Sequence, residues 1–465
     1  GITLDEIFEI TKIDRWFLYQ LQGMAELEKR IALLQDENNR LKHRDDTDSH
    51  NSSLPPSTDQ KPAKAPNEYN GRKKSGKLSG GQKGHPGHTL RLKACVEKLK
   101  AAGIEPEIEE VGDVTRPYKE RLVLDIMLKP RAVLKRFHER ADGKYNVPEE
   151  YNSEVVYGEN IKALTALLYG QGVQSAERIV ELIKAITGDT IELSQGTVFR
   201  WLETLHVSAK TEKATIEGHL LDLPQVSTDA TTVSMDGHQA YIRNFSDKQW
   251  VLYVPMDRKN IEALGKISFM QRFTGILTHD HETALYHFGT DHAECNVHLI
   301  RYLTANTENT GHKWSSKMIS LLCETNRYRR ERKTEGRAEI PQDTLLRIEA
   351  RYDELLALAR HERKLHPARF KWATQEETTL LNRLKKYKRN HLLFLHNFDV
   401  PFDNNMSERD LRKCKNRQKM AGGFRTDQGL DIFCSLLSIT ETCKRQSINL
   451  LAAFRSLFAR KSIFA

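Results

Sequence analysis

Strand-like sequence is confined to one part of this chain, and this limits the folds open to it. Between positions 223 and 280, short segments rich in β-branched and aromatic residues alternate with turn signals such as Asp236-Gly237. Helical patterns precede them, and about a hundred heavily charged residues of helical pattern follow Cys295. The sequence therefore predicts a mixed α+β or α/β fold. The strand-like segments are LPQVSTDATTVSM, QAYIRNFS, QWVLYVPM and FTGILTHD.

Residues 1–44 are expected to form N-terminal helices. Apolar side chains recur there at alternating steps of three and four, the a/d pattern of a coiled coil, with an asparagine at one a position. A dimerising coiled coil and a single amphipathic helix both fit this pattern. The positions are Met24, Leu27, Ile31, Leu34, Asn38 and Leu41.

Residues 45–93 are rich in Ser, Pro, Gly, Asn and Lys, a composition that buries too little apolar surface to fold alone. Between Lys61 and Lys93 there are nine basic residues and one acid, Glu68. We expect a flexible basic linker that makes sequence-independent contacts to DNA phosphates. A solvated linker without such contacts is the alternative. The DNA-contacting candidates in the linker are Arg72, Lys73 and Lys74.

Residues 157–210 have helical patterns. Ser175 and Ser194 are each placed to cap a helix, and Gly188 separates the two helices. Two helices around a glycine-containing turn outline a helix-turn-helix, whose second helix enters the major groove. A helical hairpin that does not touch DNA has the same pattern. The groove-facing residues would be Gln195, Thr197 and Arg200.

The overall charge favours a polyanionic partner. Lys and Arg total 72 against 63 Asp and Glu, a formal net charge of +9. The six cysteines are scattered without a C-x-x-C pair, which predicts neither a disulfide framework nor a zinc ribbon. No apolar run approaches the roughly 20 residues that span a bilayer. We therefore expect a cytoplasmic protein with no membrane partner.

Three acidic residues carry the candidate chemistry. Asp229 follows LPQVST and Asp280 closes GILTHD, so both are expected at the carboxyl ends of strands. Glu408 lies about one turn inside a predicted helix. Two aspartates on strands and a glutamate on a helix can hold two Mg²⁺ for phosphoryl transfer. Ordinary turn aspartates and an i,i+4 ion pair of Glu408 with Arg412 are the alternative.

The helix of Glu408 begins in VPFDNNMSERDLR, where the cap would be Asp403, Asn404 or Asn405. Such a cap would hold the glutamate in a fixed position.

The segment HAECNVH is a second cluster of polar residues. It holds His292, Cys295 and His298 at steps of three, so a helix would carry them on one face. This spacing can bind a metal but lacks a fourth ligand. Packing beside the acidic site, or contact with DNA, is the favoured interpretation.

From about Ile31 to its end, the chain resembles transposases of the insertion sequence 66 family. The motifs that carry the resemblance follow the family's order: NSSLPPSTD, GGQKGHPGHTL, VVYGENIKALTALLYGQGVQSAERIVELI, LSQGTVFRWL, STDATTVSMDGHQAYI, GILTHDHETALYHFGTDHAECNVHLIRYL and VPFDNNMSERDLRKCKNRQKMAGGF. The resemblance implies a ribonuclease H-like catalytic domain with an Asp-Asp-Glu site at Asp229, Asp280 and Glu408. It also implies a DNA transposase that cleaves and transfers strands with two Mg²⁺, for which Mn²⁺ can substitute.

The same resemblance implies the domain boundaries. The catalytic core would take residues 223–300 and 397–465, with a helical insertion at 301–396 between them. Residues 94–156, which look like short strands and turns, stand where the family carries a cysteine-rich zinc segment. Only Cys95 lies in that region, so zinc is not expected.

The implied partners are double-stranded DNA at the element ends and at the target, a second copy or more of the chain, and accessory proteins of the same element. The protein would act at the bacterial nucleoid. Arg409 and Arg412, beside Glu408, are candidates for phosphate contacts. A catalytically inactive, transposase-derived DNA-binding protein is the alternative. Residues 1–30 separately resemble a segment of the carbamoyl-phosphate synthase large subunit, although no ATP-binding motif follows.

Overall fold

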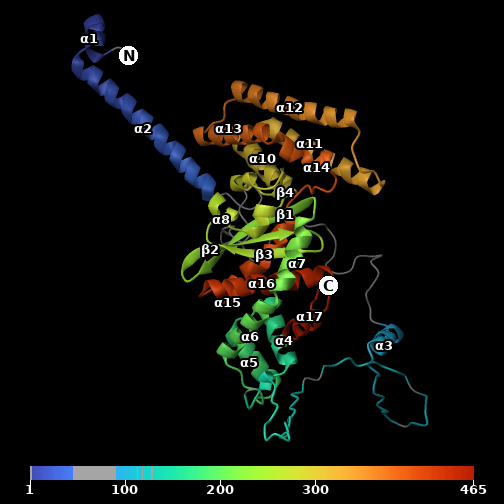
Figure 1. The fold of residues 1–465 in the computed structure, drawn as a ribbon. Helices are drawn as coiled ribbons and strands as arrows, with labels where there is room; N and C mark the ends of the chain where they lie inside the picture. Colours follow the sequence, from blue (N-terminus) through green and yellow to red (C-terminus); the bar gives the residue numbers. More distant parts are fainter. Residues whose placement is uncertain are drawn as a thin grey trace.

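A mixed five-stranded sheet lies in the middle of the computed structural model, which describes residues 3–45 and 91–464 except 113, 118, 127, 128 and 152 (Figure 1). The strand order is β3-β2-β1-β4-β5. The β1–β2 and β2–β3 pairs are antiparallel, whereas β1–β4 and β4–β5 are parallel. The bounds are β1 Gln225–Met235, β2 His238–Ser246, β3 Val251–Met256, β4 Ile276–His279 and β5 Asp291–Glu294.

The four predicted strand segments are confirmed as β1 to β4. Asp236 and Gly237 join β1 to β2 with positive φ angles of 46° and 75°, as a two-residue type I′ hairpin requires. β5 was not predicted, because its sequence DHAE has one apolar residue and was assigned to a helix.

Helices cover both edges of the sheet, and their side chains form hydrogen bonds with backbone groups of the edge strands. At the β3 edge, the hydroxyls of Ser438 and Thr442 accept hydrogen bonds from the backbone N–H groups of Tyr253 and Val251, at 2.9 and 3.2 Å. At the β5 edge, the Asn390 side chain donates to the His292 carbonyl at 2.7 Å. Covered edges cannot pair with strands of other molecules.

The helices before the sheet and those at the end of the chain share one hydrophobic core with it. α15 packs against β1 and β2, α16 against β3, and α17 against α4. Ser175 and Ser194 cap α5 and α6 as predicted. The bounds of the helices before the sheet are α4 Glu159–Gly170, α5 Ala176–Ile186, α6 Gln195–Ser208 and α7 Lys210–Leu221, and those at the end of the chain are α15 Asn405–Ala421, α16 Asp427–Arg445 and α17 Leu450–Phe458. Three short helices lie between the strands: α8 Ile261–Gly265, α9 Ser268–Arg272 and η2 Thr283–His287.

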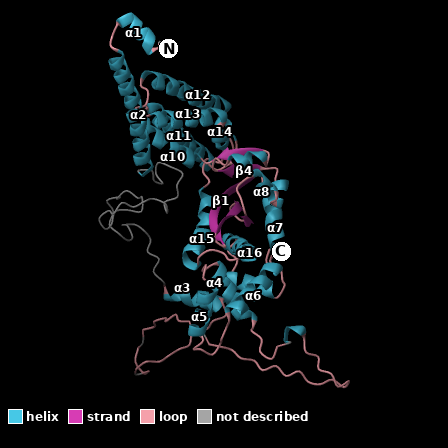
Figure 2. Ribbon diagram, turned by 90° about the vertical axis from the view of Figure 1, so that its left-hand side faces the viewer, coloured by secondary structure: helices cyan, strands magenta, loops and turns pink. Residues whose placement is uncertain are grey.

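The helices between β5 and α15 form the helical region expected at 301–396. They have a second hydrophobic core and lie at the opposite end of the sheet from α4, α5 and α6 (Figure 2). We call them the insertion. Their bounds are α10 Asn296–Thr310, α11 Lys313–Thr334, α12 Gln342–Leu365, α13 Lys371–Lys386 and α14 Lys388–His396.

Two N-terminal helices, α1 Leu4–Thr11 and α2 Arg15–Asp45, precede the rest. α2 extends beyond the insertion (Figure 1), and Asp36 accepts a hydrogen bond from the Lys371 N–H at 3.2 Å. The five apolar a/d side chains are each more than half exposed: Met24, Leu27, Ile31, Leu34 and Leu41. Coiled-coil pairing stays a prediction. Arg72, Lys73 and Lys74 lie outside the described residues.

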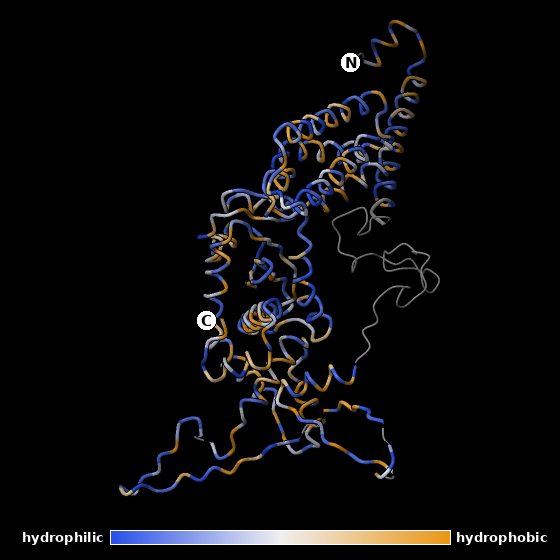
Figure 3. The backbone as a smooth tube through the Cα atoms, turned by 90° about the vertical axis from the view of Figure 1, so that its right-hand side faces the viewer, coloured by the Kyte–Doolittle hydropathy of each residue, from blue (hydrophilic) through white to orange (hydrophobic). Residues whose placement is uncertain are grey.

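The region predicted to contain short strands, 94–156, has none among its described residues. It holds α3 Leu92–Ala101, the single-turn helix η1 Glu149–Tyr151 and one isolated bridge between Glu139 and Tyr145. The prediction was wrong because its apolar side chains find nothing to pack against: Val111, Val123 and Leu134 are each more than 80% exposed, at 88, 84 and 85%. Figure 3 shows this segment running away from the main body with alternating hydrophobic and hydrophilic residues.

None of the helices in the described ranges combines the length and the apolar character needed to span a membrane.

Candidate metal centre

Asp229 and Asp280 lie side by side because β1 and β4 are parallel neighbours. The register pairs Ser227 with Thr278, so the two aspartates hold matching positions two residues further along. Asp280 directly follows β4, as predicted. Asp229 lies inside β1, which continues to Met235, so its predicted place at a carboxyl end was wrong. The reason is that β1 extends past β4 and continues to pair with β2.

Asn244 of β2 joins Asp229 to the start of α15. Its side-chain oxygen accepts from the Asp229 N–H at 3.0 Å and from the Ser407 hydroxyl at 2.6 Å. Its amide nitrogen donates to the Ser407 carbonyl at 3.2 Å. The Asn404 side chain donates to the Thr228 carbonyl at 2.9 Å. These buried bonds fix the first turn of α15 against β1.

The start of α15 sets the position of Glu408. Among the three predicted caps, Asp403 provides the side-chain bond, accepting from the Asn405 N–H at 3.1 Å. Asn404 precedes the helix without capping it through its side chain, since that amide is bonded to β1. Its carbonyl accepts from the Glu408 N–H at 3.2 Å. Of the three predicted alternatives, the cap formed by Asp403 is therefore confirmed, and a side-chain cap by Asn404 is not.

Glu408 meets Asp280 in a cluster that also contains Cys295 and His298. A potential ligand atom of each of these four residues lies within 4.8 Å of the others. The Nδ1 atom of His298 is 3.1 Å from Asp280 Oδ1 and 3.7 Å from Glu408 Oε1. In the part of the chain described, this group does not include Asp229, which stands next to it.

Three buried atoms of this cluster, Asp280 Oδ1, His298 Nδ1 and Glu408 Oε1, make no well-formed hydrogen bond in the structure, although His298 Nδ1 and Asp280 Oδ1 are close enough to form an ion pair. A buried polar atom left unpaired costs about 1–3 kcal/mol, and more when it is charged. Two of the three are carboxylate oxygens directed into one small space, and carboxylates are ligands of hard divalent cations. These residues therefore fit a divalent metal ion.

His298 faces the carboxylates with a hydrogen rather than with a lone pair. The Arg301 guanidinium lies 3.2 Å from His298 Nε2, and arginine has only donors. In a neutral ring, Nε2 therefore accepts and the proton lies on Nδ1. Burial lowers the pKa of His298, but the hydrogen bond and the charge of Asp280 outweigh it and raise the pKa, so Nδ1 keeps its hydrogen. In this arrangement the oxygen ligands come from the acids, and His298 supports them.

The raised pKa values of Asp229 and Glu408 reflect burial and the negative charge gathered around them. Burial, and then the charge of Asp280, raise the pKa of Asp229 to about 7. The same two causes raise the pKa of Glu408. A bound cation would offset both effects.

The family model described as Transposase IS66 family matches residues 154–432. The chain belongs to this family. The IS66 match begins just before α4, ends in α16 and contains the whole cluster with Asp229. Membership indicates an enzyme that processes DNA with a divalent metal. A second model, a family of unknown function (DUF6444), matches residues 10–91. No match is found among curated proteins. The resemblance of residues 1–30 to carbamoyl-phosphate synthase stays a prediction.

His292 is separated from the other two members of HAECNVH in this IS66 family chain. It lies on β5, Cys295 immediately precedes α10, and His298 lies inside α10. The prediction of one shared helix face was therefore wrong, because a strand ends in the middle of the segment. The His292 ring bonds to His279, with 3.2 Å between Nδ1 and Nε2. The thiol of Cys295 accepts from the Asn404 N–H at 3.2 Å.

The predicted DNA-contacting residues lie in two places. Arg409 and Arg412 are exposed on α15 beside Glu408, and no ion pair joins Arg412 to Glu408 in the described part of the chain. On α6, Gln195 and Arg200 are exposed, whereas the Thr197 hydroxyl is 3.0 Å from that of the capping Ser194.

The connection between α5 and α6 runs from Thr187 to Ser194. It is longer than the turn of about three to four residues in a helix-turn-helix. Groove binding by α6 stays a prediction.

Two lysines near Asp229 were not predicted. Lys259 donates to the Ala230 carbonyl at 3.0 Å, and Lys415 donates to the Thr232 hydroxyl at 3.0 Å and to the Thr232 carbonyl at 3.3 Å. Both lysines bond to carbonyls of the part of β1 that extends past its pairing with β4. Positive charge near the first acid had no local signal in the sequence, since Lys259 and Lys415 are far apart along the chain.

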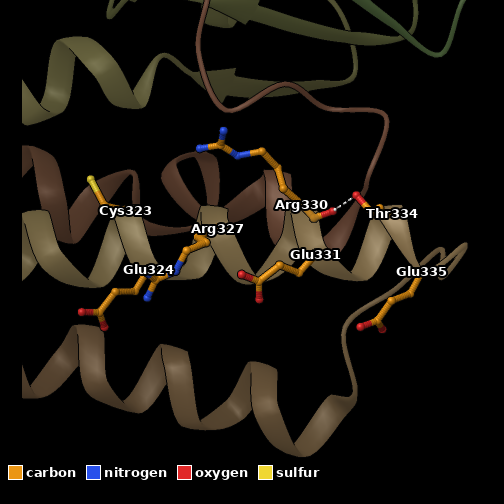
Figure 4. A pocket seen from close by; sticks show the side chains of 7 residues that line it. All are labelled: Cys323, Glu324, Arg327, Arg330, Glu331, Thr334 and Glu335. Carbon is orange, nitrogen blue, oxygen red and sulfur yellow. Dashed lines mark hydrogen bonds between the residues drawn. The ribbon is translucent and has the colours of Figure 1, made fainter. Parts of the chain in front are cut away.

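A groove of about 750 Å³ lies on α11, within the insertion (Figure 4). Its walls carry both charge signs, and none of the predicted site residues lines it. The lining residues are Cys323, Glu324, Arg327, Arg330, Glu331, Thr334 and Glu335.

Proposed function

We propose that this IS66 family member is a DDE-type DNA transposase that cleaves DNA strands at the ends of its element and transfers them to a target. The observation that carries the proposal is the buried meeting of Asp280 with Glu408, beside Asp229, with carboxylate oxygens that make no well-formed hydrogen bond to the described part of the protein. Burying carboxylates that lack partners costs free energy unless a cation binds to them.

Asp229, Asp280 and Glu408 would hold two Mg²⁺, for which Mn²⁺ can substitute. When bound, the ions would lower the pKa of an attacking water or 3′-hydroxyl and stabilise the leaving oxygen. Asn244 and Ser407 would keep the first and third acids in register through their hydrogen bonds. His298 would orient the second and third acids.

A ribonuclease H-like core is part of the proposal. It is supported by the mixed sheet, in which adjacent parallel strands carry the two aspartates, and by α15, which packs on β1 and carries the glutamate. The insertion would separate the two parts of this core, 223–300 and 397–465.

DNA would follow the basic side chains around the acids. Arg409 and Arg412 are exposed next to Glu408, and Lys259 and Lys415 flank Asp229. Gln195 and Arg200 on α6, with the basic linker, would bind the element ends at the nucleoid. Paired α2 helices would bring two ends together, with or without accessory proteins.

The test is cleavage and strand transfer on linear DNA carrying the element's own ends, in Mg²⁺ and in Mn²⁺. The wild-type chain should be active, whereas Asp229→Ala, Asp280→Ala and Glu408→Ala should not. Lys29→Ala, an exposed substitution on α2, serves as control. Equal background activity in all variants and the wild type would favour an inactive DNA-binding protein.

A further inference from the structure

Glu294, the last residue of β5, has a fully buried carboxylate with partners on both oxygens. Oε1 accepts from His281 Nδ1 at 2.6 Å and from the Tyr286 hydroxyl at 2.5 Å. Oε2 accepts from Arg383 Nε and Nη2 at 3.0 and 2.6 Å, and from His391 Nε2 at 3.1 Å. A buried carboxylate with this many donors is held in one position.

The charge of Glu294 is stable despite its burial. Burial alone would raise the pKa of this carboxyl, but hydrogen bonds from His281 and His391 and the charge of Arg383 outweigh it and lower the pKa. Glu294 is therefore ionised and acts as a fixed acceptor.

One pair of partners belongs to the loop that carries Asp280. His281 is the next residue, and Tyr286 lies in η2. The residue after His281 is fastened as well, since Glu282 pairs with the buried Arg243 of β2 at 2.6 Å. The two residues that follow Asp280 are thus tied to strands on either side.

The other pair of partners belongs to the insertion, with Arg383 on α13 and His391 on α14. His391 is the last of three successive α14 residues that bind β5. Arg389 pairs with Asp291 at 2.5 Å, and Asn390 donates to the His292 carbonyl. Glu294 is therefore the acceptor that the Asp280 loop and the insertion share.

We propose that Glu294 is a positioning residue for Asp280, and that through it the insertion holds the metal centre in its binding geometry. The role rests on the proposed function, because it assigns metal binding to Asp280. Release of Arg383 or His391 would free the Glu294 carboxylate, then His281, and then the adjacent metal ligand.

A carboxylate that only stabilises the insertion would not affect the metal. Glu377 of α13 is such a residue and serves as a matched control. It is also 1% exposed, and it binds Trp314 and His312 at 2.7 Å each and Arg363 at 3.2 Å. All of these partners lie within the insertion.

The experiment compares Glu294→Gln with Glu377→Gln in the full chain. Mn²⁺ binding is measured without DNA by electron paramagnetic resonance, and unfolding by circular dichroism. Both variants should be less stable than the wild type. Only Glu294→Gln should bind Mn²⁺ more weakly, by about tenfold, as for other residues that orient metal ligands. It should also lower kcat for cleavage without raising KM for DNA.

Equal Mn²⁺ affinity in the two variants would overturn the positioning role. If Glu294→Gln does not fold, His281→Phe decides, because it keeps a ring at a partly exposed position and removes the bond to Glu294. Wild-type Mn²⁺ affinity in His281→Phe would overturn the role. Asp280→Asn separates the two proposals: if it does not weaken Mn²⁺ binding, the metal site itself is wrong, whatever Glu294 does.

Discussion

Asp229 on β1 and Asp280 after β4 occupy matching positions along two parallel strands, and the charge of Asp280 disfavours the charged form of Asp229. With the pKa of Asp229 raised to about 7, a metal ion must compete with a proton near neutral pH. Mn²⁺ affinity should therefore fall as the pH drops below about 7. Titrations with Mn²⁺ on either side of this pH measure the effect, and Asp229→Asn should flatten it. Affinity independent of pH in the wild type would contradict the prediction.

Asp280→Asn should abolish cleavage and yet stabilise the metal-free protein. The substitution removes one of the charges crowded at Asp229 and Glu408, so the free energy of unfolding in a chelator should rise by about 1 kcal/mol. Added Mn²⁺ should then stabilise the variant less than the wild type, because a ligand is lost. Thermal unfolding with chelator and with Mn²⁺ measures both. Lower stability in chelator would show that Asp280 is not under repulsion.

His298→Gln should weaken Mn²⁺ binding by only about tenfold, as expected when a residue that orients metal ligands is replaced. Because Arg301 donates to Nε2, the proton lies on Nδ1, and the ring supports the carboxylates instead of binding the ion. Cleavage should still fall, because Asp280 and Glu408 lose the group that orients them. A large loss of Mn²⁺ affinity, comparable to that of Glu408→Gln, would instead make His298 a ligand.

The sequence predicted β1 to β4 because their alternating apolar residues and turn signals are local. It also pointed to Asp229, Asp280 and Glu408, which the fold brings near one another although long segments separate them. That proximity depends on the parallel pairing of β1 with β4, which no short segment encodes.

β5 and the bonds of Glu294 could not be predicted in this way. Four residues with a single alanine as their apolar member have no strand pattern, and they are stabilised by pairing with β4 and by α14. The partners of Glu294 come from α13, α14 and η2, so its role follows from tertiary contacts alone.

The insertion should lose stability as the pH rises. His312 lies 2.7 Å from Glu377 through Nδ1 and 2.7 Å from the His366 carbonyl through Nε2, so both nitrogens donate only when the ring is charged. Burial lowers the pKa of His312, but these bonds outweigh it and raise the pKa above the ordinary value of 6.5. This stabilisation is complete below 6.5 and is lost as the pH rises through the folded-state pKa.

Amide hydrogen exchange in α11 and α13 measures this local stability. Protection should fall with rising pH, after correction for the intrinsic exchange rate, and His312→Gln should remove the dependence at a cost of about 1–3 kcal/mol. His396, paired with Glu349 at 2.9 Å on the surface, provides the control. The same loss in His396→Gln would mean that the buried bonds are not the cause.

α2 should pair with the α2 of a second copy through its a/d side chains. Asp36, which binds the insertion, lies at an f position on the far side of the helix from Ile31 and Leu34. Docking on the insertion therefore leaves the apolar seam free. Charged residues in such a seam oppose association, so Ile31→Asp with Leu34→Asp should give a monomer.

Light scattering of the full chain across a concentration series measures this state. Lys29→Asp, also at an f position, places a new charge on the same helix outside the seam and should leave the dimer intact. Circular dichroism should show the insertion folded in each variant, because its core does not include α2. A wild-type chain that stays monomeric at all concentrations would leave α2 as a single amphipathic helix, and two element ends would then have to be joined by other surfaces.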